Sequence, residues 1–349
     1  MNTFEKKISN EIKKITHENL CDYTPGLCLQ VVQSGKLKAN LRLGETYKYY
    51  DLASLTKIIF TVPAFMALYD EKRIGLNDHV SQILNWWPHS QTQLSQVLSH
   101  SARLPWWAPF YKKINLKSSV AIRREQVQKI LSKTKLTRSK KSVYSDLDFI
   151  LLGFVLEALH DASLLDVWQN VGWSENVPSL HFNVSNKLKY KKSLYAPTER
   201  CPWRKKILQG EVHDDNTWAF GGVSTHAGLF GQIEDVTKYG MILRDSLRGK
   251  NTDFVSPRTI KKFSRRAVSR AYGDWALGFM MPTRGSASCG QYFSPTSFGH
   301  TGFTGTSFWY DPKKDLQVVL LSNRVHPSRE NKKFVELRPL IHDLIVKNI

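Results

Sequence analysis

The apolar residues near the amino terminus repeat at helical spacing. Phe4, Ile8, Ile12 and Ile15 fall on one face of a helix, and charged residues occupy many of the positions between them. From residue 26 onward the period changes to two. Apolar residues alternate on both sides of a Ser-Gly-Lys turn over residues 26–43, which predicts a β-hairpin. The chain is therefore predicted to begin with an amphipathic helix and two strands.

The next segment, residues 54–72, is apolar on most sides and predicts a helix that is buried nearly all round. Pro63 lies inside this segment and is expected to distort it, because proline lacks the N–H that a helix interior uses. Helical patterns then dominate the middle of the chain, at residues 94–99, 119–131 and 146–159.

Strand patterns return near the carboxyl terminus. Residues 275–281, 306–310 and 316–322 are predicted strands. The sequence Asp-Pro-Lys-Lys at residues 311–314 predicts a hairpin turn between the last two strands, because aspartate and proline favour tight turns. A closing helix is predicted over residues 332–349.

Strands at both ends of the chain with helices between them favour the α+β class. The antiparallel sheet would be built from both chain ends and flanked by helices, with a mostly helical subdomain beside it. The sequence has no repeat and no long Pro/Gly/Ser linker, so we expect a single domain over residues 1–349. Its α/β part would comprise about residues 1–75 and 270–349, and its helical part about residues 76–269.

The composition indicates a globular protein and excludes several other classes. The 349 residues are 41% hydrophobic and 23% charged, which is too apolar for a disordered chain. No apolar run reaches the roughly 18–20 residues of a transmembrane segment. The amino terminus lacks the continuous apolar stretch of a secretory signal, so we expect a cytoplasmic protein, or a periplasmic one if a signal has been removed. The 4 cysteines form no zinc-ligand pattern, and no metal or cofactor is expected.

Basic residues are in large excess. The chain has 50 Lys and Arg against 30 Asp and Glu, a formal net charge of +20. Between residues 112 and 141, eleven basic residues accompany a single acid, Glu125. Such a surface attracts polyanions with a strength that falls as salt rises, so an anionic polymer is a candidate partner. A solvated face with no dedicated partner is the simpler interpretation, because the aromatic residues typical of a single-strand binding track are missing.

The sharpest chemical signal is a serine at the predicted start of a helix with a lysine three residues later. Ser54 and Lys57 would share one face of that helix. A serine is a poor nucleophile until a base takes its proton, and a lysine beside the positive end of a helix can have its pKa lowered enough for that task. Taken alone the spacing is weak evidence, because a capping serine followed by a surface lysine has the same pattern.

Two further motifs follow in order. Tyr144-Ser145-Asp146 directly precedes an apolar helical segment, and His300-Thr301-Gly302 lies just ahead of a late strand. With Ser54 and Lys57 they resemble the serine β-lactamase and penicillin-binding-protein superfamily, whose elements are Ser-x-x-Lys, Tyr-x-Asn or Ser-x-Asn, and Lys-Thr-Gly or His-Thr-Gly. The tyrosine version is similar to class C β-lactamases, D-alanyl-D-alanine carboxypeptidases and related esterases.

The resemblance extends from about residue 26 to about residue 323, and residues 94–105 and 221–230 also look like segments of that family. It implies a β-lactamase/transpeptidase-like fold and an acyl-enzyme formed at Ser54. Lys57 and Tyr144 would share the proton transfers, and the backbone N–H groups of Ser54 and Phe303 would form the oxyanion hole. The implied substrate-binding residues are Asp146, His300, Thr301, Gly302 and Phe303.

Two positions depart from the usual pattern. Asp146 stands where the family more often has asparagine, which removes a donor to the substrate and adds a negative charge that could pair with Lys57. His300 replaces the lysine of most β-lactamases, so the groove has no permanent cation there. Both changes argue against an efficient β-lactamase. The arginines considered as a replacement cation are Arg265, Arg270 and Arg284.

Three other features are weaker candidates. A metal site could be imagined from the cluster His213, Asp214, Asp215 and His226, but a loop that shapes the groove is the simpler interpretation. Ser224 lacks the second glycine of a nucleophile elbow, because a histidine occupies that position. The tryptophans at 106 and 107 would pack the helical region or lie at the groove mouth.

The sequence therefore predicts a serine hydrolase that acts through an acyl-enzyme on D-alanyl peptide, amide or ester substrates, with weak or no β-lactamase activity. Its substrate would be a small molecule or a peptide, and a peptidoglycan-derived peptide fits. The alternative is a catalytically degraded family member that uses its basic surface to bind an anionic polymer or a partner protein.

Overall fold

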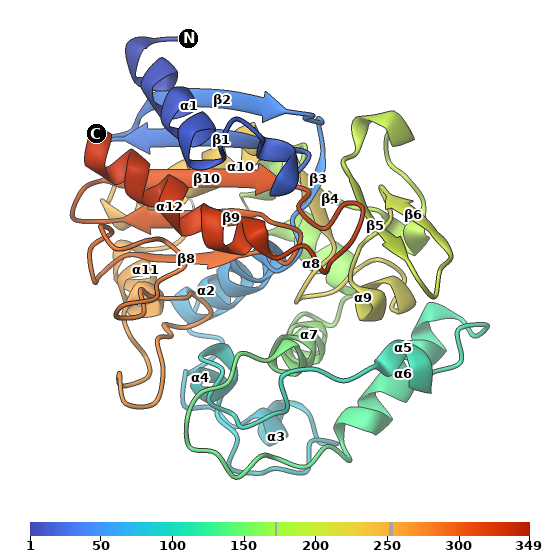
Figure 1. Cartoon of the computed structure of the whole chain (residues 1–349). Helices are drawn as coiled ribbons and strands as arrows, with labels where there is room; N and C mark the ends of the chain where they lie inside the picture. Colours follow the sequence, from blue (N-terminus) through green and yellow to red (C-terminus); the bar gives the residue numbers. More distant parts are fainter. Residues whose placement is uncertain (172, 251–253) are drawn as a thin grey trace.

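The computed structural model describes residues 1–171, 173–250 and 254–349. Its centre is a five-stranded antiparallel sheet with strand order β2-β1-β10-β9-β8 (Figure 1). The sheet joins both ends of the chain, because β1 pairs with β10 over seven residue positions. The strands are β1 (Gly26–Gln33), β2 (Lys36–Gly44), β8 (Phe298–Thr301), β9 (Ser307–Asp311) and β10 (Leu316–Ser322). The predicted α+β arrangement is confirmed.

The two faces of the sheet bury alternate side chains of the same strands. On β1, Leu27, Leu29 and Val31 join a core beneath α1 (Thr3–Ile15) and α12 (Lys333–Asn348). Cys28 belongs to the larger core on the opposite face, where α10 (Ile233–Leu247) packs on β1 and β10. In Figure 1, α1 and α12 cross the near face of the sheet, and α10 lies behind it.

A mostly helical region lies below the sheet in Figure 1 and surrounds α7. Helix α7 is buried along most of its length, which explains its nearly continuous apolar sequence. The helices outside the two layers are α2 (Val62–Asp70), α3 (Val80–Ile83), α4 (Leu94–Leu98), α5 (Phe110–Lys113), α6 (Val120–Leu131), α7 (Asp146–His160), α8 (Leu164–Asn170), α9 (Asp215–Ala219) and α11 (Pro257–Ser264). Single 3₁₀ turns span Leu20–Asp22, Ser174–Asn176, Val184–Asn186 and Lys192–Leu194.

Two small sheets complete the fold. One has the order β3-β7-β4, and the other pairs β5 with β6. Their strands are β3 (Tyr50–Asp51), β4 (His181–Phe182), β5 (Pro197–Cys201), β6 (Lys206–Gln209) and β7 (Leu229–Gly231). Helix α10 falls within residues 76–269 yet contacts the main sheet, and the division of the domain into an α/β part and a helical part remains a prediction. In the described part of the chain, no helix is both long and apolar enough to span a membrane.

The helix predicted over residues 54–72 consists of two parts. A π-helical turn covers Lys57–Thr61, and α2 follows it. Pro63 lies in the first turn of α2, where its missing N–H breaks the regular hydrogen-bond ladder between the two parts. The predicted distortion at this proline is confirmed.

One predicted strand is wrong. Residues 275–281 form a tight turn with isolated bridges from Met280 to Trp275 and to Gly299. Gly278 has a φ of 86°, and a Cβ there would lie 2.1 Å from a methyl carbon of Val62. The alternating sequence at residues 275–281 therefore forms a turn that packs on α2. The strand at this edge of the sheet is β8, which the sequence pattern did not predict.

Candidate active site

Ser54 lies in the short loop between β3 and the first turn of the following helix. The carboxylate of Asp51 shapes this loop by accepting the backbone N–H groups of Ala53 at 2.8 Å and His213 at 2.6 Å. The Thr306 hydroxyl binds the Leu52 carbonyl oxygen at 3.0 Å and so ties the loop to the start of β9. Ser54 is thus held against the edge of the main sheet.

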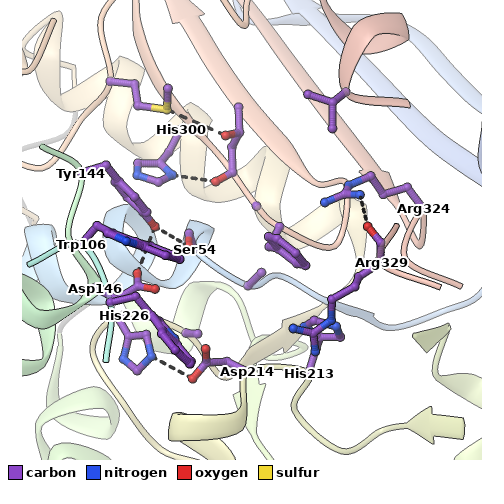
Figure 2. Close-up of a pocket in the computed structure, with 18 of the residues that line it drawn as sticks. Ser54, Trp106, Tyr144, Asp146, His213, Asp214, His226, His300, Arg324 and Arg329 are labelled. Carbon is purple, nitrogen blue, oxygen red and sulfur yellow. Dashed lines mark hydrogen bonds and ion pairs between the residues drawn. The ribbon is translucent and has the colours of Figure 1, made fainter. Parts of the chain in front are cut away.

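The side chains of Tyr144 and Lys57, both predicted to be catalytic, meet at Ser54; Figure 2 shows Tyr144 beside Ser54. The Tyr144 hydroxyl lies 2.7 Å from Ser54 Oγ. Lys57 Nζ donates a hydrogen bond to the same oxygen at 3.0 Å. The structure therefore brings a hydroxyl, an amine and a phenol within proton-transfer distance, as the three separate motifs predict.

Lys57 is enclosed completely. Its side chain is 0% exposed, and Nζ also donates to Asp146 Oδ1 at 2.8 Å and to the His226 carbonyl oxygen at 2.9 Å. Burial lowers the pKa of Lys57, and the nearby Asp146 carboxylate opposes that change. The ammonium also lies 5.0 Å from the centre of the Tyr144 ring.

Tyr144 and Asp146 reach the site because they stand at the start of α7. The Ser145 side chain caps this helix by accepting the Asp148 N–H, and it donates to the Pro105 carbonyl oxygen at 2.7 Å. The Tyr144 ring stacks on Trp275 with an interplanar angle of 19°. Burial and the Asp146 carboxylate raise the pKa of Tyr144 well above its usual value.

The Asp146 side chain points toward Lys57 and Tyr144. Its Oδ1 accepts hydrogen bonds from Lys57 Nζ and from the Tyr144 hydroxyl, the latter at 3.2 Å. The pairing with Lys57 considered from the sequence is therefore present. A direct contact of Asp146 with substrate stays a prediction, although the residue also lines the pocket.

A pocket of about 610 Å³ opens over Ser54. The four residues predicted from the third motif all line it: His300, Thr301, Gly302 and Phe303. A Cβ at Gly302 would lie 2.8 Å from the Leu52 carbonyl oxygen and 2.0 Å from the Thr306 hydroxyl oxygen. The glycine is thus required by the approach of the Ser54 loop as well as by any substrate. No hydrogen bond from the Ser54 or Phe303 backbone N–H occurs within the described residues, and the oxyanion hole remains a prediction.

His300 is neutral in this setting. It is buried, and burial together with the charge of Lys57 lowers its pKa to about 3. Its Nδ1 lies 2.8 Å from the Thr301 carbonyl oxygen, which can only accept, so the proton is on Nδ1. His300 therefore does not supply a cation to the pocket.

The positively charged side chains that line the pocket belong to arginines that were not predicted from the sequence. Arg324, Arg329 and Arg338 line it, whereas Arg265, Arg270 and Arg284 are not among the lining residues of the described chain. Figure 2 shows Arg324, Arg329 and His213 on the side of the pocket opposite Tyr144 and His300. These arginines follow the last strand, so their clustering depends on the turn from β10 into α12. Their positions in the sequence form no motif that could have marked them as pocket residues.

The three pocket arginines differ in their pairing. Arg329 forms an ion pair with Glu199, and no carboxylate of the described chain lies within salt-bridge distance of Arg324 or Arg338. Burial and the charge of Arg324 lower the pKa of Arg338 to about 10. The Arg338 Nε atom is buried and has no hydrogen-bond partner among the described residues. Two cations therefore face the pocket with incomplete compensation.

The cluster considered as a metal site is only partly assembled. Asp214 and His226 lie near Asp146, with one ligand atom of each within 4.8 Å of the others. These groups already bind other partners, because Lys57 pairs with Asp146 and His226 Nε2 lies 2.9 Å from Asp214 Oδ1. An ammonium group beside the cluster repels a second cation, so we assign no metal here.

The structure also shows where the two tryptophans and the second candidate serine lie. Trp106 is 63% exposed and lines the pocket with Trp107, whose ring stacks on it. Both lie at the groove mouth, one of the two positions considered. Ser224 is buried and is not among the described residues that line the pocket, and its hydroxyl lies 2.8 Å from His226 Nδ1.

The order and spacing of the three motifs, the sheet and the pocket all agree with one family. Residues 13–338 match the family model described as Beta-lactamase. This chain belongs to the β-lactamase family. The recognition made from its motifs is therefore confirmed.

Curated relatives in the β-lactamase family carry a more specific name. A protein of Salmonella agona with the provisional name D-alanyl-D-alanine carboxypeptidase is 28% identical over 335 residues, which cover 85% of this chain and 74% of that protein. A Salmonella typhimurium protein of the same name is 28% identical over 326 residues, covering 82% of this chain and 72% of the relative.

Solved structures show the same fold. EstCE1, described as a hydrolase with promiscuous acyltransferase activity, has a TM-score of 0.72 at 17% identity and covers 98% of this chain and 99% of its own. The octameric penicillin-binding protein homologue from Pyrococcus abyssi has a TM-score of 0.69 at 16% identity, covering 95% of this chain and 76% of its own. The β-lactamase/transpeptidase-like fold is thereby confirmed for this member of a serine hydrolase family.

Proposed function

We propose that this protein is a serine hydrolase that forms an acyl-enzyme at Ser54 and removes the terminal residue from peptides ending in D-alanine. The observation that carries the proposal is the position of Ser54 Oγ between the Tyr144 hydroxyl and Lys57 Nζ, at the base of the pocket. Esters and amides of similar shape are secondary substrates. The names of the Salmonella relatives support the peptide class.

The reaction begins when Ser54 Oγ attacks the acyl carbon while its proton leaves toward Tyr144. The N–H groups of Ser54 and Phe303 would stabilise the negative oxygen that develops. The leaving amine then takes a proton from Tyr144, and water hydrolyses the acyl-enzyme by the same steps in reverse. Lys57 lowers the energy of the serine alkoxide through its hydrogen bond to Oγ.

The pocket arginines support a substrate with a free carboxylate. Arg324 lies over the Phe303 ring with 4.8 Å between its guanidinium carbon and the ring centre, and Phe303 directly follows the motif at the edge strand. A peptide aligned along β8 would direct its terminal carboxylate toward Arg324 and Arg338. An ion pair there would relieve two buried, uncompensated cations.

The arrangement at Ser54 favours the enzyme over the alternative of a binding protein with a degraded pocket. The basic segment at residues 112–141 includes the end of α5 and all of α6, and both helices lie at the periphery of the molecule in Figure 1. Contact of that segment with an anionic polymer stays a prediction.

The test is release of D-alanine from diacetyl-lysyl-D-alanyl-D-alanine. We expect release by the wild-type protein and none by Ser54→Ala. The same peptide with an amidated carboxyl terminus serves as the matched control and should react poorly. Hydrolysis of nitrophenyl esters without any peptide cleavage would make the protein an esterase, and no reaction with either substrate class would contradict the proposal.

A further inference from the structure

The hydrogen bonds of Lys57 leave its amine no free lone pair. Its Nζ is within 3.0 Å of three oxygen atoms, those of Ser54, Asp146 and the His226 carbonyl. A carbonyl oxygen and a carboxylate oxygen accept only, so two of the three bonds must come from Lys57 protons. The negative charge of the Asp146 carboxylate also favours a third proton on Lys57 Nζ. Lys57 is then an ammonium group that donates a hydrogen bond to Ser54 Oγ.

The protons of the two hydroxyl groups are then fixed in direction. The Tyr144 hydroxyl has two neighbours, Ser54 Oγ at 2.7 Å and Asp146 Oδ1 at 3.2 Å. Because the carboxylate can only accept, Tyr144 donates to Asp146. Ser54 Oγ already accepts from Lys57, so its own proton points to the Tyr144 oxygen. A directed chain therefore runs from Ser54 through Tyr144 to Asp146.

We propose that Asp146 is the terminal acceptor of the Ser54 proton during acylation, with Tyr144 as the carrier. This inference rests on the proposed function. As Ser54 Oγ bonds to the acyl carbon, its proton moves to the Tyr144 oxygen, and the Tyr144 proton moves to Asp146 Oδ1. When the tetrahedral intermediate collapses, the leaving group takes a proton from Tyr144, which recovers one from Asp146. The carboxylate, the phenol and the ammonium are restored, so the protons balance.

The chain avoids an unfavourable charged intermediate. Burial raises the pKa of Tyr144 well above its usual value, so a resting phenolate is costly. Passing one proton on as another arrives keeps Tyr144 neutral throughout. An asparagine at residue 146 would accept the same two hydrogen bonds through its oxygen but could not take the proton.

The charge on Asp146 depends on every titratable group that faces it. Lys57 stabilises the carboxylate from the helix opposite, and Tyr144 donates to it from its own segment. Asp148 and His100 form a buried pair behind Tyr144, 3.1 Å apart, and burial raises the pKa of Asp148 well above its usual value. The other groups around the cluster are Asp214, His226 and His300.

The relay is tested with p-nitrophenyl acetate, whose leaving group needs no proton, so that only the first transfer is measured. We expect the acylation rate of the wild type to fall in acid, because the relay needs an unprotonated acceptor at its end. The Asp146→Asn variant should lose this decrease in rate at low pH, the acid limb of the pH profile. Its acylation should be about 100-fold slower than that of the wild type at neutral pH. Asp148→Asn, the same change on the same helix, replaces a carboxyl group that contacts His100 instead of Ser54, Lys57 or Tyr144, and it should keep the wild-type pH profile.

A double-mutant cycle separates the relay from a purely structural effect. In the Tyr144→Phe background the carrier is missing, so adding Asp146→Asn should change the rate by less than about twofold. An equal effect of Asp146→Asn in both backgrounds, or an unchanged acid limb in the single variant, would overturn the relay.

Two further measurements keep the outcomes distinct. If Asp146→Asn does not fold, the wild-type rate is measured in mixtures of light and heavy water. The acylation rate is plotted against the fraction of heavy water. Transfer of two protons in one step gives a curved plot and supports the relay, whereas a straight line overturns it. Peptide mass spectrometry of the acetylated wild type locates the adduct. An acetyl group on Ser54 with an unchanged pH profile in Asp146→Asn contradicts the relay alone, and no Ser54 adduct contradicts the proposed function too.

Discussion

Ser54 Oγ lies 2.7 Å from the Tyr144 hydroxyl, although 90 residues separate the two along the chain. Each is positioned by a helix start, Ser54 before the π-helical turn and Tyr144 before α7. Both helices are buried in the same core, so their first residues are held at a fixed separation. Side chains at the ends of packed helices are held more precisely than side chains on loops, which suits the catalytic roles proposed for Ser54 and Tyr144.

Lys57→Met should destabilise the protein as well as stop acylation. The change keeps the volume of the side chain but leaves the Asp146 carboxylate, 17% exposed, without its cation. We expect a loss of about 3 kcal/mol in the free energy of unfolding, measured by urea denaturation. Adding Asp146→Asn should recover part of that stability without restoring acylation. A double variant less stable than Lys57→Met alone would contradict the pairing.

Arg338→Gln should weaken recognition of a substrate carboxylate. Arg338 is 5% exposed, lines the pocket and has a buried Nε without a partner among the described residues. We expect KM for diacetyl-lysyl-D-alanyl-D-alanine to rise by about tenfold or more, because a charge-assisted contact is lost. The kcat/KM for p-nitrophenyl acetate should hardly change, and exposed Arg265→Gln is the matched control. An equal decrease in kcat/KM for both substrates would show a structural effect of the substitution instead.

Stability should fall in mild acid, in part through His181. Its imidazole lies between the Ser179 carbonyl oxygen at 2.6 Å and the Tyr195 hydroxyl at 2.8 Å, and burial lowers its pKa to about 4. The unfolded chain therefore binds more protons than the native chain between pH 6.5 and 4, so this contribution is complete above pH 6.5 and is lost as the pH falls. By pH 5 the loss is about 2 kcal/mol.

The check is urea unfolding of the wild type and of His181→Gln at pH 7 and pH 5. The variant should start less stable at pH 7, because glutamine replaces a fitted ring, and should lose less on acidification. If both proteins lose the same free energy between the two pH values, His181 is not the titrating group.

The sequence predicted those parts of the fold whose residues interact with near neighbours. The helix bearing Ile8 and Ile12 and the hairpin over residues 26–43 follow from local periodicity, and the structure confirms both. The strand predicted at 275–281 failed because its alternation comes from packing around Gly278, whose positive φ depends on α2 and not on its neighbours in sequence. Edge strand β8 has only four residues, too few for a periodic signal.

In the candidate site, too, residues set by local sequence were predicted and residues set by distant contacts were not. Ser54, Lys57 and Tyr144 are found from short motifs, because each motif is a local geometry at a helix start. The arginines at 324 and 338 could not be assigned in this way, since they approach the pocket only after β10 pairs with β1 and α12 folds over the sheet. The double hydrogen bond of Asp146 also needs two distant segments to meet.

The most direct test of the account is covalent labelling of Ser54. The wild-type protein is incubated with a fluorophosphonate or a fluorescent penicillin, and the adduct is located by peptide mass spectrometry, with Ser54→Ala and the buried Ser224→Ala as matched variants. The account predicts one adduct on Ser54 in the wild type and in Ser224→Ala, and none in Ser54→Ala. A folded wild-type protein that reacts with neither probe, or an adduct that persists in Ser54→Ala, would contradict it.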